Sequence, residues 1–159
     1  MRYAKVHVED VQPGDPMPPL VKPPIQQIQL TRYAGASGDF NPIHQDDAFA
    51  RAAGMGGVFA HGMLSMGFVA QSVTDWVGVG RIRKISVRFA ALVRLGDVIT
   101  CRGKVREKRP AKSGHDHDVD LEIPVVLVVG DREPDRDRRL VAGRDLGDVL
   151  GACLPSFGR

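Results

Sequence analysis

The stretch GMLSMGFVAQSVTDWVG, residues 62–78, decides the fold of this chain. Drawn as a helix, it carries apolar side chains on nearly every side, namely Met63, Leu64, Met66, Phe68, Val69, Val73, Trp76 and Val77. A helix that is apolar all round is buried and not a surface helix. Polar residues interrupt the stretch, which is also too short to span a bilayer. We therefore predict a central helix that other elements must wrap.

The chain after this helix is almost entirely strand-like. Apolar and polar residues alternate with period two over several parts of residues 81–93, 97–109, 117–130 and 138–150. The sequences RLGD and KSGHD supply turns between them, and the charged run DREPDRDRR is typical of a solvated hairpin tip. A central apolar helix followed by an antiparallel meander predicts an α+β fold, in which an antiparallel sheet wraps around the helix.

The chain before the central helix combines extended and helical segments. Residues 3–11 alternate like a strand, and residues 13–24 hold too many prolines to be helical, so they are expected to run extended across the surface. Residues 25–38 carry a helical stripe that either Gly35 or Gly38 can end with a left-handed cap.

A second, short helix is expected over residues 45–54, and a glycine-rich loop follows it. Asp46 and Asp47 are acids suited to the start of this helix, and Gly54 is a stop signal.

Composition limits the class of protein. The 159 residues fit a single domain, residues 1–159. With 22 basic residues scattered among 19 acidic ones and a net charge of +3, we expect no nucleic-acid partner. The first residues lack the apolar region of a signal peptide, so no membrane association is expected. The two cysteines, Cys101 and Cys153, form no metal-type or disulfide-type spacing, which favours a cytoplasmic protein.

The candidate site lies in SGDFNPIHQDD, residues 37–47, and VFAHGMLSMGF, residues 58–68. Asp39 and His44 stand five residues apart on a segment that glycine and proline keep from forming a regular helix. Such a pair alone is more often part of a capped turn than catalytic, with about one chance in ten of chemistry. A second histidine, His61, directly precedes Gly62 at the start of the apolar helix, and this favours a catalytic role for the group.

The run YAGASGDFNPIHQDDAFARAAGMGGVFAHGML resembles the hydratase motif of the MaoC-like, (R)-specific enoyl-thioester hydratase and dehydratase family, whose members have the hot-dog fold. The similarity is closest to the B-type subunit of the heterodimeric (3R)-hydroxyacyl-ACP dehydratases. It implies reversible hydration of 2-enoyl thioesters in fatty-acid or polyketide-type metabolism. It also implies catalytic roles for Asp39 and His44, an oxyanion role for the Gly62 N–H, and an acyl chain lying along the helix.

The residues themselves suit that chemistry. Hydration of an enoyl thioester needs a base for water, an acid for C2 and a stabiliser of the charge on the thioester oxygen. If the Asn41-Pro42 turn folds the loop back, Asp39 and His44 can share one water at about 3 Å. The N–H of Gly62 would face a substrate carbonyl at the positive end of the helix, and the missing side chain allows close approach.

The remaining site residues are given supporting or substrate-binding roles. Asn41 is expected to hold the loop through its side chain, His61 to orient the helix start or simply to pack, and Met63 to line the core or an acyl tunnel. The family pattern has a serine near position 70 in several single-chain hydratases. This chain has Ala70 there, which puts a complete stand-alone site in doubt.

Neither a metal nor a cofactor is predicted. His115 and His117 share one face of a predicted strand, but spacing places no third ligand near them. The RIRK cluster, residues 81–84, is either a basic rim for the phosphates of CoA or phosphopantetheine, or the solvent face of a strand.

The expected partners are an acyl thioester of CoA or acyl-carrier protein and a second hot-dog chain, as a homodimer or heterodimer. In heterodimers of the family one chain holds the catalytic residues, and the intact motif assigns that role to this chain. Two alternatives stay open. One is a non-catalytic acyl-thioester-binding subunit, and the other is a thioesterase that attacks C1 instead of C3.

Overall fold

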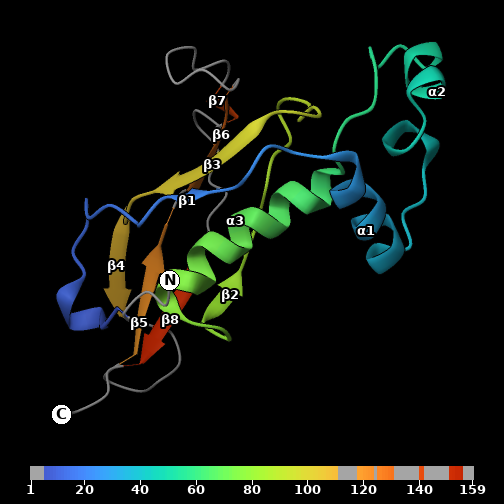
Figure 1. Cartoon of the computed structure of the whole chain (residues 1–159). Helices are drawn as coiled ribbons and strands as arrows, with labels where there is room; N and C mark the ends of the chain where they lie inside the picture. Colours follow the sequence, from blue (N-terminus) through green and yellow to red (C-terminus); the bar gives the residue numbers. More distant parts are fainter. Residues whose placement is uncertain (1–5, 111–117, 124, 131–139, 142–150, 156–159) are drawn as a thin grey trace.

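The computed structural model describes residues 6–110, 118–123, 125–130, 140–141 and 151–155. The helical elements are η1 (Val8–Asp10), α1 (Gln27–Ser37), η2 (Pro42–His44), α2 (Asp47–Ala52) and α3 (Gly62–Val77). The strands are β1 (Leu20–Val21), β2 (Ile82–Lys84), β3 (Val98–Gly103), β4 (Glu107–Pro110), β5 (Asp118–Glu122), β6 (Val125–Gly130), β7 (Leu140–Val141) and β8 (Gly151–Pro155). In Figure 1, α3 crosses the middle of the molecule, the strands lie along it, and α1 and α2 stand at the end where α3 begins.

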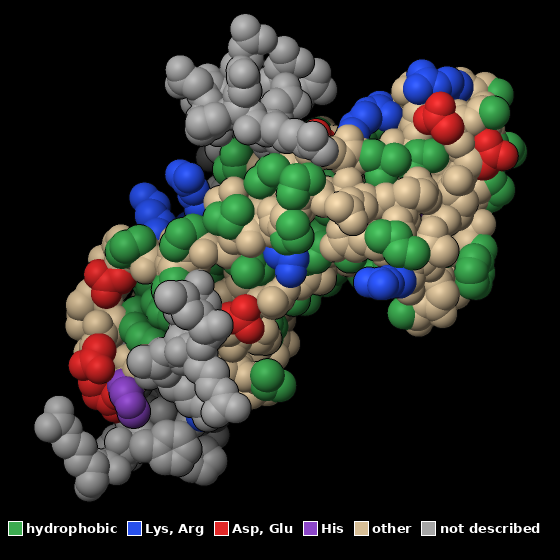
Figure 2. Space-filling view, viewed as in Figure 1, with side chains coloured by type: hydrophobic (Ala, Val, Ile, Leu, Met, Phe, Trp, Pro, Cys, Tyr) green, Lys and Arg blue, Asp and Glu red, His purple; other side chains and the backbone are tan. Residues whose placement is uncertain are grey.

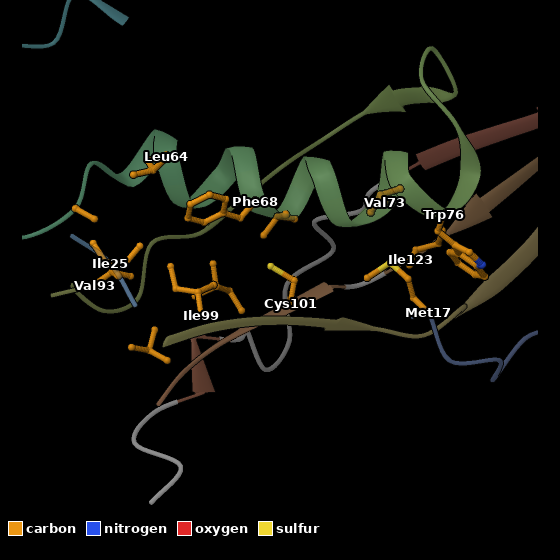
Figure 3. Packing of buried hydrophobic residues seen from close by; sticks show 14 of the residues in the cluster. Met17, Ile25, Leu64, Phe68, Val73, Trp76, Val93, Ile99, Cys101 and Ile123 are labelled. Atoms are coloured by element: carbon orange, nitrogen blue, oxygen red, sulfur yellow. The ribbon is translucent and has the colours of Figure 1, made fainter. Parts of the chain in front are cut away.

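The central helix begins and ends as its sequence predicts, at Gly62 and Val77. Its burial is one-sided, however, because the buried residues form one stripe: Leu64, Ser65, Phe68, Val69, Ser72, Val73, Trp76 and Val77. Met63, by contrast, is 55% exposed. The prediction of burial on every side was therefore wrong within the described chain, because sheet residues cover only the stripe that faces β3 and β6. Figure 3 shows Phe68 and Val73 on the side of α3 that faces β3.

Two sheets carry the core, with strand orders β1-β3-β6-β7 and β2-β8-β5-β4, and every pairing is antiparallel. The predicted strands 97–109 and 117–130 each divide into two. Gly103 is the last residue of β3 and pairs with Val125 of β6, whereas Glu107 begins β4 and pairs with Glu122 of β5. The chain therefore passes from one sheet to the other over residues 104–106, and both sheets contribute residues to one core.

Other strand predictions were met only in part. Of residues 81–93, only Ile82–Lys84 form a strand. Of residues 138–150, the structure describes Leu140–Val141 alone, and these two form a strand. The alternating start contains a 3₁₀-helix at Val8–Asp10 and no described strand. The predicted hairpin tip at 131–139 and the turn at 112–116 lie outside the described residues.

The proline-rich segment is extended as predicted, and it forms an edge of the sheet. Met17 and Lys22 donate their N–H groups to the carbonyls of Gly103 and Ile99, and β1 pairs with β3 between these points. Proline lacks an N–H, so it is tolerated at a sheet edge where some groups face away from the ladder. The segment thus lies beside β3 and leads the chain to α1.

The core joins α3 to both sheets (Figure 3). Ile25, Ile99 and Ile123 are among the largest fully buried side chains. Cys101 is also fully buried, and burial raises the pKa of its thiol to about 11. None of the helices in the described part of the chain has the length and apolar character that a bilayer crossing needs.

Candidate active site

The segment that carries Asp39 and His44 is a capped, irregular turn. Gly38, with φ 76°, ends α1, which excludes the alternative end at Gly35. The Oδ1 atom of Asn41 accepts from the N–H of Ile43 at 3.2 Å and caps the short 3₁₀-helix Pro42–His44. The Asn41 side chain is therefore engaged in holding this turn. Its carbonyl also accepts from the N–H of His44 at 3.0 Å.

The buried His44 ring, 6% exposed, is fixed by the backbone of another loop. Its Nδ1 lies 2.7 Å from the carbonyl oxygen of Phe59, and the Phe59 ring packs edge-on against the imidazole at 4.8 Å between centroids. A carbonyl only accepts hydrogen bonds, so Nδ1 carries the proton. In neutral His44 the lone pair is then on Nε2, which makes that atom the proton acceptor.

The loop that supplies the Phe59 carbonyl is held at both ends. Asp46 caps α2, and Oδ1 of Asp47 accepts from the N–H of Val58 at 3.2 Å. Hydrogen bonds from Arg51 and from Val58 lower the pKa of the Asp47 carboxyl. Ala60 donates its N–H to the carbonyl of Val93 at 2.7 Å. These bonds connect the glycine-rich loop to α2 and to the chain after β2.

The guanidinium of Arg94 reinforces this loop by reaching two of its carbonyls. It donates to the carbonyl of Gly57 at 3.1 Å and to that of Met55 at 2.6 Å. The N–H of Arg94 itself donates to Asp97 in the turn before β3. This role of Arg94 could not be predicted from the sequence, because its partners are backbone atoms almost forty residues away along the chain.

His61 is more deeply buried than His44, with 1% of its surface exposed. Its Nε2 lies 3.1 Å from the carbonyl oxygen of Asp39, so this nitrogen donates and Nδ1 keeps a lone pair. Nδ1 has no hydrogen-bond partner among the described residues. Burial lowers the pKa of His61, and a nearby His44 charge acts in the same direction; the Asp39 carbonyl and carboxylate oppose this.

The three side chains meet in one cluster, which we call the Asp-His-His site: Asp39, His44 and His61. One carboxylate oxygen and one ring nitrogen from each histidine lie within 4.8 Å of one another. Asp39 is exposed, whereas both histidines are buried. The site is thus open on the carboxylate side. The sequence predicted a supporting role for His61. Its contact with Asp39 and His44 was indicated only by its position directly before Gly62, at the start of α3.

Gly62 begins α3 next to the site, where the first N–H groups of a helix have no partner within the helix. A Cβ atom at Gly62 would lie 3.3 Å from atoms of the Phe89 ring. Phe89 is 54% exposed, and the sequence suggested no role for it because it falls in a segment expected to be strand.

Ala70, which stands where several relatives have a serine, is only partly buried, and the neighbouring Ser72 donates to the carbonyl of Val69. His115 and His117 lie outside the described residues.

A helix lying against antiparallel strands, with an acid and two histidines beside its first turn, defines a hot-dog protein with a polar site at the helix start. The profile of the MaoC like domain family matches residues 10–125, most of the chain. The chain therefore belongs to this family.

Known proteins agree with that assignment. The chain is 36% identical over 90 residues to an (R)-specific enoyl-CoA hydratase from Rhodospirillum rubrum, covering 55% of this chain and 62% of the hydratase. It is 38% identical over 74 residues to a fatty acid synthase subunit beta from Aspergillus oryzae, covering 44% of this chain but only 4% of the synthase. An R-hydratase from Pseudomonas aeruginosa, solved without ligand, is similar in fold, with a TM-score of 0.72 and 22% identity over 96% of this chain and 86% of that one. The hot-dog fold expected from the sequence is thereby confirmed.

Proposed function

We propose that this chain is a hydro-lyase that adds water reversibly to 2-enoyl thioesters and gives (3R)-hydroxyacyl thioesters. The observation that carries the proposal is the tautomer of His44, whose Nδ1 proton is held by the Phe59 carbonyl at 2.7 Å. A general base needs a free lone pair within reach of the proton it removes. Nε2 of neutral His44 carries such a lone pair, and a nitrogen of the His44 ring lies within 4.8 Å of an Asp39 carboxylate oxygen. The name of the hydratase relative supports the same reaction class.

The proposed reaction uses the three groups in sequence. Asp39 and His44 hold one water between them, and the pair takes a proton as the water oxygen bonds to C3. The electron pair of the double bond moves toward the thioester oxygen, and the N–H of Gly62 stabilises the charge there. The pair then returns a proton to C2, so that one hydrogen and one hydroxyl are added in total.

The substrate would approach from the exposed side of the site. Asp39 and its neighbour Phe40 are exposed, and so are Met63 and Phe89 beside Gly62. These apolar side chains suit an acyl chain, and CoA and acyl-carrier protein deliver the same thioester group. The acyl chain would then lie along α3, as the family resemblance implies.

We further propose that the chain works as a homodimer or as a heterodimer with a second hot-dog chain. Figure 2 shows apolar side chains gathered along the middle of the visible face. Large apolar residues are exposed in several elements of the described chain: Val21, Ile28, Phe40, Phe49, Met55, Met63, Val79, Phe89, Leu92 and Leu95. Exposed apolar surface of this kind marks interaction sites.

The test is a hydration assay with crotonyl-CoA on the purified chain, alone and with any co-encoded hot-dog partner. Asp39→Asn and His44→Gln should each lower the rate at least roughly a hundredfold, the scale for losing a positioned acid or base. The matched variants Asp75→Asn and His7→Gln change exposed residues outside the site and should keep wild-type rates. Release of free CoA without hydration would instead identify a thioesterase. Folded Asp39→Asn and His44→Gln proteins with rates within a few-fold of wild type would refute the catalytic assignment.

A further inference from the structure

The Asp-His-His site contains three hydrogen-bond acceptors and no donor of its own. The Nδ1 proton of His44 is used by the Phe59 carbonyl, and the Nε2 proton of His61 by the Asp39 carbonyl. The remaining ring nitrogens each present a lone pair, and an ionised carboxylate only accepts. One carboxylate oxygen and one nitrogen from each ring lie within 4.8 Å of one another.

A single water cannot satisfy three acceptors, because it has two hydrogens. The unmet group is visible in the structure, since the Nδ1 atom of the 1% exposed His61 has no partner among the described residues. A buried acceptor without a partner is costly. A cation can contact all three groups favourably at once.

The donor set indicates which cation. Two imidazole nitrogens and one carboxylate suit zinc and neighbouring divalent transition metals, whereas magnesium and calcium prefer sites made of oxygen atoms. Each histidine also gives its other ring N–H to a backbone carbonyl, the arrangement that orients histidine ligands in metal sites. We propose that Asp39, His44 and His61 together bind a divalent transition-metal ion such as Zn²⁺ in the place where the reacting water would lie.

The geometry requires the cluster to close and one ring to turn. Ligand atoms of a tetrahedral zinc ion lie about 3.4 Å apart, given zinc to ligand distances near 2.0–2.1 Å, whereas the three groups here lie within 4.8 Å of one another. The two rings lie 3.9 Å apart between centroids with a tilt of 32°, so one of them must turn for both lone pairs to meet at one ion. The Asp39 side chain is exposed, and the one bond to it among the described residues comes from the N–H of Asn41 at 3.3 Å. The carboxylate is therefore the ligand best able to move toward the ion.

Bound metal would act as an inhibitor and not as a cofactor. The ion takes the lone pair of His44 that the proposed base needs, and it occupies the position of the water. This consequence depends on the proposed hydratase function, but the binding of metal does not. No metal was predicted from the sequence, because spacing draws attention to His115 and His117 and not to this cluster.

Calorimetric titration of the untagged, full-length chain with ZnCl₂ tests the proposal. We expect one Zn²⁺ per chain, and Asp39→Asn, His44→Gln and His61→Gln should each weaken binding at least roughly tenfold, with Asp39→Asn the decisive variant because an exposed carboxylate is not needed for folding. Asp75→Asn and His7→Gln should bind as wild type. MgCl₂ should give no comparable heat. Absence of Zn²⁺ binding, or binding unchanged in folded Asp39→Asn, would overturn the site.

A parallel assay separates the two proposals. In a chain that hydrates crotonyl-CoA, Zn²⁺ should abolish turnover and EDTA should restore it. Zn²⁺ binding by a chain that shows no hydration under any condition would support the metal site and contradict the proposed function. Full hydration with Zn²⁺ bound at saturation would contradict the stated position of the ion.

Discussion

The imidazole rings of His44 and His61 lie 3.9 Å apart between centroids, with their planes tilted by 32°. Two rings this close repel each other if both carry a positive charge, because the buried site contains little water to screen the charges. His61 is the more buried of the two. Its pKa is lowered first by burial and further by any charge on His44. The pair is thus built to keep His61 neutral.

The first prediction concerns stability against pH. The pKa of His61 in the folded chain lies below its ordinary value of 6.5, so between these two values the unfolded chain binds more protons. The free energy of unfolding should therefore rise with pH in this window and fall as the solution is acidified from pH 6.5 downward. Urea unfolding at a series of pH values, with EDTA present, measures it.

His61→Gln should make this pH dependence shallower, because glutamine does not titrate in the window. His7→Gln, which removes an exposed histidine, should leave the wild-type slope unchanged. If His61→Gln kept the full slope of wild type, another group would be responsible for the loss of stability in acid.

The second prediction concerns Gly57 in the loop that orients His44. Gly57 has φ 126°, and a Cβ atom there would lie 2.8 Å from Oδ1 of Asp47. Gly57→Ala should therefore lower the free energy of unfolding by about 1–3 kcal/mol, the usual cost of a strained backbone conformation. It should also reduce activity, because the Phe59 carbonyl lies two residues further along. Thermal and urea unfolding measure the first effect.

Gly35→Ala is the matched control for Gly57→Ala. Gly35 lies inside α1 and is exposed, with nothing within 4 Å of an added Cβ. Alanine there should raise stability by about 0.5–1 kcal/mol, because glycine weakens a helix interior. Equal effects of the two substitutions would show that the Gly57 backbone is not constrained.

Much of the helical part of the fold could be predicted from local signals. The bounds of α3 follow from the glycines that flank its apolar run, and the end of α1 from Gly38. The break between β3 and β4 could not be predicted, because the intervening residues 104–106 contain no glycine or proline to mark it. The one-sided burial of α3 could not be predicted from the sequence either, because it depends on which strands cover the helix.

The site was predictable where its parts are close in sequence. Asp39 and His44 share one capped turn, so a local motif brings them together. His61 enters through packing against His44, and Phe89 reaches Gly62 from beyond the whole of α3. Contacts of that sequence separation leave no periodic or turn signal. The unpartnered nitrogen of His61 is likewise visible only in three dimensions.

The third prediction concerns assembly. The large apolar side chains exposed in the described chain should be covered by a second chain, since contiguous apolar surface is rarely left in water. At micromolar concentration, sedimentation should give the mass of a dimer, or of a heterodimer when a hot-dog partner is present. A well-folded monomer with full hydration activity would contradict both the dimer and the need for a partner.

The last prediction tests the oxyanion role of Gly62. If its N–H binds the thioester oxygen, a side chain there should obstruct the carbonyl while leaving the Asp-His-His site in place. Gly62→Val keeps the N–H but should hold the thioester oxygen away from it, so kcat/KM for crotonyl-CoA should fall at least roughly tenfold; complete loss of an oxyanion donor costs about a hundredfold or more. Gly67→Val is the matched control, because Gly67 lies exposed in the same helix with nothing within 4 Å of an added Cβ. It adds the same side chain to the same helix, and because valine is no worse than glycine in a helix interior, it should keep both its stability and its turnover.

Phe89 offers a way to separate obstruction of the carbonyl from displacement of a neighbour. An added Cβ at Gly62 would lie 3.3 Å from the Phe89 ring, so Gly62→Val must push this half-exposed side chain aside. If obstruction of the carbonyl causes the loss, the double variant Gly62→Val with Phe89→Ala should stay as slow as Gly62→Val alone, with melting temperatures measured beside the kinetics. Wild-type turnover in folded Gly62→Val would show that the carbonyl is held elsewhere. Full recovery in the double variant would show that displacement of Phe89, and not obstruction of the Gly62 N–H, causes the loss.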